Sequence, residues 1–78
     1  MDLELTEKQL LIILAEEWDK TGPPGYLETK ILAERLNLSV ENTKSVIHSL
    51  FVKGFVDTDS IEHYAAYLTP EGYEAAQS

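Results

Sequence analysis

Residues 29–55, TKILAERLNLSVENTKSVIHSLFVKGF, carry the pattern that decides the fold. In the first part of this stretch, apolar side chains recur at helical spacing and form one face, at Leu32, Ala33 and Leu36. Residues 37–39, Asn-Leu-Ser, interrupt the pattern, because Asn and Ser favour turns over helix interiors. A second helical stripe follows at Thr43, Val46, Ile47 and Leu50. The stretch therefore predicts two helices joined by a tight turn, which is a helix-turn-helix unit.

The second helix of this unit has residues that suit its two ends. Ser39 is placed to accept a hydrogen bond from a free backbone amide, as an N-cap does. Lys53 falls in the last turn, where its positive charge is favourable for the helix dipole. Gly54 suits the left-handed conformation that follows many helix ends. The second helix is therefore expected over about residues 39–53.

This stretch resembles the helix-turn-helix core of winged-helix proteins, such as the MarR and PadR regulators. In those families a Leu-Ala pair, a turn, a Ser cap, a second helix and a Leu-x-x-x-Gly segment precede a β-hairpin, the wing. The matching positions here are Leu32-Ala33, Asn37-Leu38-Ser39 and Leu50-Phe51-Val52-Lys53-Gly54. Residues 67–76, YLTPEGYEAA, also resemble the junction between the wing and the helix after it. The resemblance covers most of the chain and implies a winged-helix fold, which serves both DNA-binding regulators and protein-interaction modules.

A further helix is predicted before this unit, to about residue 20. Thr6, as N-cap, and Gln9 fit a capping box at its start. Its main apolar face consists of Leu10, Ile13, Leu14 and Trp18. The apolar surface extends to a second side at Leu11, Ile12 and Ala15. A helix with two apolar sides needs more than one partner, so the second side either packs inside the domain or forms a homodimer surface. A dimer would suit regulators that bind paired half-sites.

The segment between the first two helices has turn and strand chemistry. Residues 21–25, with two prolines and two glycines, must end the first helix. Tyr26 and Leu27 predict a very short strand. Thr29 is then the expected N-cap of the helix that runs to Leu36.

The last third of the chain predicts a hairpin and a final helix. Strands are expected at 55–56 and 64–68, with turn chemistry at 57–60 between them. Thr69 is the expected N-cap of the last helix, followed by a favourable proline and glutamate. Its Tyr73, Ala75 and Ala76 should pack against the first helix. The prediction is one α+β domain over residues 1–78, mostly α, with a three-helix core and a β-hairpin wing, in the order helix, strand, helix, helix, strand, strand, helix.

Charge is the main argument against DNA binding. The chain of 78 residues has a formal net charge of −8, with only six Lys and Arg, and phosphate contacts need cations. The charge is uneven, however. Residues 28–53 carry three acids and four bases, a net charge of +1, while residues 1–20 carry −4 and residues 55–68 carry −3. Contact with DNA stays open, and we expect it to be weak and strongly salt-sensitive for a lone monomer.

The helix at 39–53 is the element expected in the major groove. Its outward residues and the cations near it form the predicted DNA-contacting set: Val40, Glu41, Lys44, Ser45, His48, Ser49, Lys30, Arg35 and Lys53. The wing residues are Asp57, Thr58, Asp59, Ser60, Glu62 and His63. Winged-helix DNA binders often carry Arg or Lys at the wing tip, and the acidic wing here departs from that pattern. The alternative function is an acidic protein-interaction module that steers toward a basic protein partner and does not bind DNA.

Catalytic and metal chemistry find little support in the sequence. Without cysteine there is no disulfide framework and no thiolate site, and no residue pattern indicates an enzyme or a cofactor. His48 and His63 would make a metal pair only if they converged with a carboxylate such as Asp57 or Glu62, so no metal is predicted. The tyrosines are expected in core and hairpin packing. The longest apolar run, 10–15, is too short to cross a bilayer, and the chain is expected to be soluble and cytoplasmic.

Overall fold

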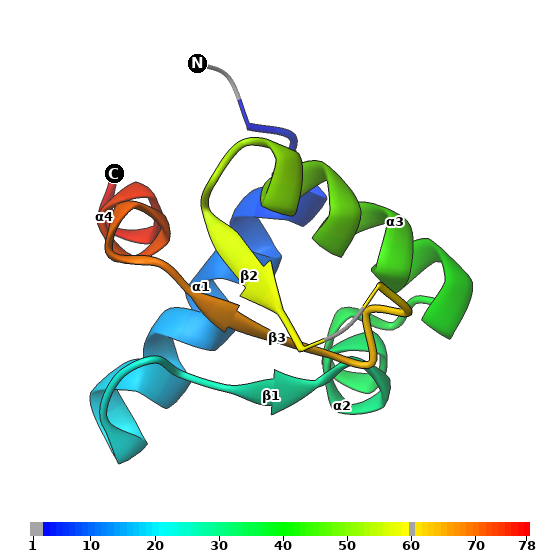
Figure 1. Cartoon of the computed structure of the whole chain (residues 1–78), viewed down its shortest axis with the longest axis horizontal. Coiled ribbons are helices and arrows are strands. Elements are labelled where there is room, and N and C mark those ends of the chain that lie inside the picture. Colours follow the sequence, from blue (N-terminus) through cyan, green and yellow to red (C-terminus); the bar gives the residue numbers. More distant parts are fainter. Residues whose placement is uncertain (1–2, 60) are drawn as a thin grey trace.

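The computed structural model describes residues 3–59 and 61–78, and its elements follow the predicted order (Figure 1). They are α1 (Leu5–Thr21), β1 (Leu27–Glu28), α2 (Thr29–Leu36), α3 (Val40–Val52), β2 (Val56–Thr58), β3 (Ala65–Leu68) and α4 (Pro70–Gln77). The three strands form one antiparallel sheet in the order β1-β3-β2. Val56 of β2 pairs with Leu68, and Leu27 of β1 pairs with Ala66 on the other side of β3. The α+β fold class with a β-hairpin wing is confirmed.

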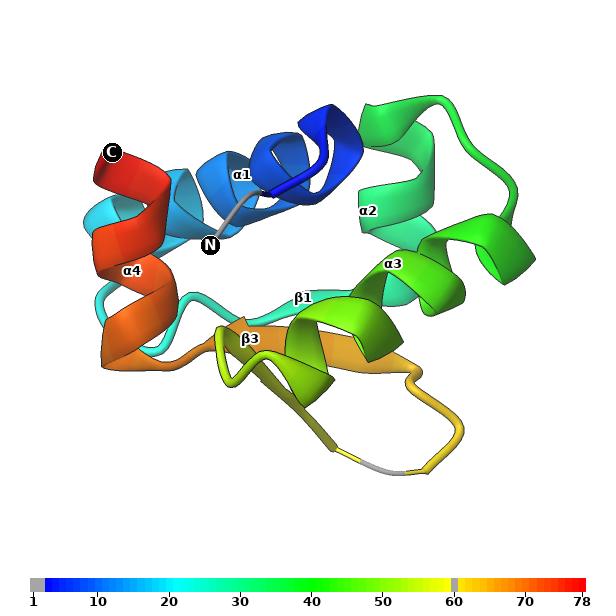
Figure 2. The ribbon, with the colours of Figure 1, turned by 90° about the horizontal axis from the view of Figure 1, so that it is seen from above.

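An apolar cluster of buried residues lies between the helices and the sheet. In Figure 2, α1 lies on the side of this cluster opposite the sheet, with α2 and α3 toward one end and α4 toward the other. The cluster consists of Leu10, Leu11, Leu14, Ala15, Leu27, Leu32, Ile47, Leu50, Val56, Ala66 and Leu68. The predicted inward stripe of α3 is confirmed, since Thr43, Ile47 and Leu50 are fully buried and Val46 is half-buried. Among the described residues, no helix is both long enough and apolar enough to cross a membrane.

The start of α1 differs from the prediction. The helix begins at Leu5 with Glu4 as its N-cap, so the assignment of Thr6 as N-cap is wrong. The Glu4 amide donates to Glu7 Oε1 at 2.9 Å, which is the reciprocal contact of a capping box. Glu7 is buried, and it takes the place that the prediction gave to Gln9.

The second apolar side of α1 packs inside the chain. Leu11 is 0% exposed and Ala15 is 5% exposed, so for these two side chains the alternative of packing inside the domain is the one observed, rather than a homodimer surface. Only Ile12 of the three keeps an exposed side chain, at 39%. The sheet and the other helices supply the second partner that the two-sided helix needs.

The helix-turn-helix unit follows the local signals in the sequence. Asn37 adopts the left-handed conformation at φ +57°, and the Leu38 amide donates to the Ala33 carbonyl at 2.9 Å to close α2. Ser39 is the N-cap of α3, as predicted, and its hydroxyl accepts from the Asn42 amide at 3.0 Å. Gly54 follows the helix at φ +84°, a conformation that glycine tolerates best.

The junction before α2 lies one residue later than predicted. The short strand is Leu27–Glu28 rather than Tyr26-Leu27, and Glu28 rather than Thr29 is the N-cap of α2. Thr29 is the first helical residue and is buried. Its hydroxyl donates to the His63 carbonyl, and its amide donates to the Tyr64 carbonyl at 2.8 Å. The Thr29 side chain is therefore buried and hydrogen-bonded to the segment before β3, and it does not cap α2.

The strands of the wing and α4 are close to their predicted places. β2 starts one residue later and continues through Thr58, and β3 starts after Tyr64. Thr69 is the N-cap of α4, as predicted, and its hydroxyl accepts from the Gly72 amide at 3.0 Å. Tyr73 packs on α1, where its ring stacks on Trp18 with centroids 4.6 Å apart.

Candidate nucleic-acid interface

The first two turns of α3 present an open face. Val40 is 41% exposed, and Glu41 and Ser45 are exposed beside it. The Ser45 hydroxyl donates to the Glu41 carbonyl within the helix at 3.3 Å. Lys44 is half-buried, and its ammonium lies over the ring of Tyr64, 4.8 Å from the centroid. This part of α3 carries apolar, hydroxyl, acidic and cationic groups.

Three elements meet beside this face. A hollow of about 220 Å³ is lined by Glu28, Thr29, Lys30, Val40, Lys44 and Tyr64. Lys30 is exposed in the first turn of α2, and Tyr64 precedes β3 with 60% of its surface exposed. The structure thus brings the predicted residues Lys30, Val40 and Lys44 together. Tyr64 also belongs to this set, although the sequence pattern placed it in a strand and assigned the tyrosines to packing.

The far end of α3 is tied to α1 rather than presented to solvent. Lys53 donates to both oxygens of Glu7, at 2.9 and 2.8 Å, and the Ser49 hydroxyl donates to Glu7 Oε2 at 2.6 Å. Burial alone would raise the pKa of Glu7, but the hydrogen bonds from Lys53, Ser49 and the Glu4 amide hold it below its usual value. The polar groups of Ser49 and Lys53 are thus engaged by a buried carboxylate in this structure, and their contact with DNA stays a prediction.

Arg35 lies apart from the other cations of the unit. It lines a different hollow, of about 310 Å³, with Gln9, Ile12, Ile13 and Leu36 of α1 and α2. The lysines of the α3 face and Arg35 are therefore not joined in one site.

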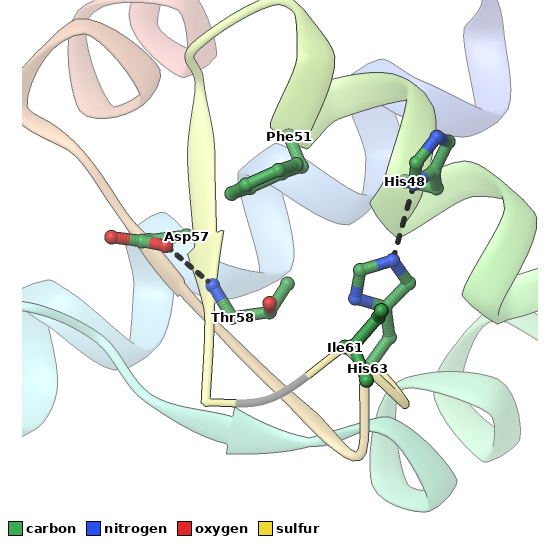
Figure 3. A pocket seen from close by; sticks show the side chains of 6 residues that line it. All are labelled: His48, Phe51, Asp57, Thr58, Ile61 and His63. Atoms are coloured by element: carbon green, nitrogen blue, oxygen red, sulfur yellow. Dashed lines mark hydrogen bonds between the residues drawn. The ribbon is translucent and has the colours of Figure 1, made fainter.

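His48 and His63 connect α3 to the wing. His48 Nδ1 and His63 Nε2 are 3.2 Å apart, within hydrogen-bond distance. The two rings border a hollow of about 430 Å³ that is also lined by Phe51, Asp57, Thr58 and Ile61 (Figure 3). Within residues 3–59 and 61–78, no group of three or more His, Cys, Asp and Glu side chains is arranged to hold a metal ion. The two histidines therefore lie together, but the described residues place no carboxylate with them in a metal-binding arrangement.

The wing is acidic where it is described. Asp57 and Thr58 lie in β2, and the Asp57 carboxylate accepts from the Thr58 amide at 2.9 Å. The negative charge of Asp57, with burial and a hydrogen bond to the same carboxylate, raises the pKa of Tyr67. Asp59 and Glu62 are exposed in the following turn, and Ser60 lies outside the described residues. His63, the last residue of this group, contacts His48 of α3.

These features define a winged helix-turn-helix fold, in which α2 and α3 form the helix-turn-helix and β2 and β3 form the wing. Solved structures support this assignment. ZitR of Lactococcus lactis, in a C30AH42A mutant form, has a TM-score of 0.74 at 17% identity, over 99% of this chain and 50% of that one. A protein of Ralstonia eutropha, provisionally assigned as DNA-binding, has a TM-score of 0.76 at 23% identity, over 97% of this chain and 95% of that one. The adhesin competence repressor AdcR of Streptococcus pyogenes has a TM-score of 0.71 at 22% identity, over 97% and 54%.

The likeness confirms the winged-helix resemblance at the level of the fold. This chain spans about half the length of the ZitR and AdcR chains and nearly the whole of the Ralstonia chain. No protein-family model matches the sequence, and no curated protein sequence matches it.

Proposed function

We propose that this protein is a DNA-binding winged-helix protein of the transcription-regulator class that places α3 in the major groove. The observation that carries the proposal is the group Lys30, Val40, Lys44 and Tyr64 at the open end of the helix-turn-helix. Structural neighbours of the same fold include a repressor and a protein provisionally assigned as DNA-binding. A helix that presents its first turns to the groove is the usual docking of this motif.

The chemistry of the open face suits the two kinds of contact that DNA binding needs. Ammonium groups contact phosphates and fix the register, while apolar and hydroxyl groups contact base edges. Lys30 and Lys44 would supply the first kind. Val40, beside a thymine methyl, and Ser45 would supply the second.

The acids around this face limit the expected affinity. Glu28 lines the hollow and Glu41 lies in the first turn of α3, so both would oppose phosphate. The wing adds Asp57 and Asp59, which keep it away from the backbone. We therefore propose weak contact by one protomer and useful affinity only from a homodimer on paired half-sites. The cytoplasmic location and the absence of catalysis remain predictions that go with this proposal.

The test is the salt dependence of DNA binding measured by fluorescence anisotropy with a mixed-sequence duplex. Lys44→Gln should weaken binding at low salt by about threefold to tenfold and should reduce the slope of log affinity against log salt by about one, since one phosphate contact is lost. Lys20→Gln, in the last turn of α1, is the matched control. An equal loss for both variants would mean that only net charge matters, and no loss for Lys44→Gln would refute this docking.

A second candidate function is favoured by one observation at the wing. Phe51 and Ile61 are 43% and 90% exposed and border the hollow beside Asp57. Exposed apolar groups next to acids suit a basic protein partner. This candidate predicts that Ile61→Ser abolishes capture of the partner while DNA affinity is unchanged, and loss of DNA affinity in the same variant would count against it.

A further inference from the structure

We infer that Tyr64 is a positioning residue for DNA binding, because its ring holds the Lys44 ammonium ready for a backbone phosphate. The inference rests on the proposed function and adds a residue to its site. The Lys44 Nζ lies 4.8 Å from the centroid of the Tyr64 ring, within the range of a cation–π interaction. Tyr64 is 60% exposed, so the ring is not used to fill the core.

The contact restrains Lys44 without occupying its hydrogen-bond donors. An ammonium group has three N–H donors, and attraction to a ring face leaves those on the outer side available. Lys53 and Lys8 show the contrast. Lys53 gives its donors to Glu7, and Lys8 donates to the carbonyls of Ala75 and Ser78. Lys44 is therefore both restrained and able to bind an anion.

The backbone places the ring through two hydrogen bonds from the start of α2. The Thr29 amide donates to the Tyr64 carbonyl at 2.8 Å, and the Thr29 hydroxyl donates to the neighbouring His63 carbonyl. Thr29 is itself 2% exposed. These bonds fix the turn before β3 against α2, and α3 then brings Lys44 over the ring. The start of α2, the turn before β3 and α3 together form the contact, so its geometry is set by the fold rather than by a freely moving surface side chain.

The position of the hollow explains what the restrained lysine would meet. Lys30, Lys44 and Val40 line it together with the acidic Glu28. A phosphate of a strand that flanks the major groove would lie between the two ammonium groups while Val40 faces the base edges. Holding Lys44 at this spot before binding removes part of the ordering that an unrestrained lysine would undergo on binding.

A double-mutant cycle separates a positioning role from other roles. Binding of a mixed-sequence duplex at low salt is measured for Tyr64→Leu, Tyr64→Phe, Lys44→Gln and the Tyr64→Leu/Lys44→Gln double variant. We expect Tyr64→Leu to weaken binding about twofold to fivefold, Tyr64→Phe to bind as the unchanged protein does, and Tyr64→Leu to have little further effect once Lys44 is Gln. Thermal unfolding of each variant checks that the fold is kept.

The outcomes are distinguishable from failure of the proposed function. If Lys44→Gln weakens binding and Tyr64→Leu weakens it additively, the inference is overturned and the proposed docking stands. If Tyr64→Phe binds DNA as weakly as Tyr64→Leu does, the hydroxyl rather than the ring face of Tyr64 contributes to binding, and this result also overturns the inference. If neither Lys44→Gln nor Tyr64→Leu changes DNA affinity, both the inference and the proposed docking are overturned.

A measurement without DNA tests the contact itself. The ring should shift the NMR signals of the Lys44 ε-protons upfield in the unchanged protein and in Tyr64→Phe. This shift should be lost in Tyr64→Leu. Signals of an ordinary solvent-exposed lysine in the unchanged protein would overturn the inference independently of any DNA result.

Discussion

Replacing Lys53 by Met should destabilise the fold strongly although the position caps a helix that we assign to DNA binding. The Lys53 side chain is 25% exposed and that of Glu7 is 4% exposed. Met keeps the apolar stem of Lys53 but removes the ammonium that donates to both Glu7 oxygens. The carboxylate is left with the Ser49 hydroxyl and the Glu4 amide.

The magnitude follows from the burial of the two partners. Removing one partner of a fully buried ion pair costs about 3–5 kcal/mol, because the other charge stays uncompensated. Here the lysine side is partly open to water, and Glu7 keeps two other donors, so a loss of about 2–3 kcal/mol in the free energy of unfolding is expected. For a domain of this size that corresponds to a fall in Tm of about 10–20 °C.

The assay is urea and thermal unfolding followed by circular dichroism at neutral pH. Lys20→Met, an exposed position in the last turn of α1, is the control and should change the free energy of unfolding by less than about 0.5 kcal/mol. The difference between Lys53→Met and the unchanged protein should shrink in acid, where Glu7 becomes neutral. A loss of less than about 0.5 kcal/mol for Lys53→Met at neutral pH would refute the reasoning.

Three further predictions concern stability. The Glu7 pKa is lowered in the folded state, so its ionised carboxylate stabilises the fold above the unfolded pKa of about 4.3. This stabilisation is lost as pH falls through the folded pKa. Glu7→Gln should therefore reduce the loss of stability in acid, measured by unfolding between pH 7 and 2. A Cβ at Gly72 would lie 1.8 Å from the Phe55 carbonyl oxygen, so Gly72→Ala should cost about 3 kcal/mol in urea unfolding, and a neutral result would contradict this packing. Ser39→Ala removes the cap on the Asn42 amide and should cost about 1 kcal/mol, with an unchanged urea midpoint as the contrary result.

Local signals made the helix-turn-helix predictable. The Ser39 cap, the turn at Asn37 and the glycine after α3 each act within a few residues, so the sequence alone located them. The start of α1 was missed because Glu7 is fixed by Lys53, which is 46 residues away in the chain. A capping residue that also serves a distant partner has no local pattern that reveals it.

The site was only partly predictable for the same reason. Val40 and Lys44 were identified because spacing on a helix shows which residues point outward, and Lys30 was included as a nearby cation. Ser49 was assigned to the outward face by spacing and Lys53 was included as a nearby cation, although both side chains donate to the Glu7 carboxylate of α1. Tyr64 and the contact between His48 and His63 depend on where the wing folds back against α3, and no spacing along the chain contains that information.

The most direct test of the account is an amide-resolved NMR titration with a mixed-sequence DNA duplex at low and at moderate salt. We predict shifts at Lys30, at residues 40–48 and at Tyr64 that fade as salt is raised, with little change at Asp57 and Asp59. No shifts at protein and duplex concentrations of about a millimolar, above the usual range of non-specific dissociation constants, would contradict DNA binding by this chain. Shifts confined to the wing would contradict the docking of α3.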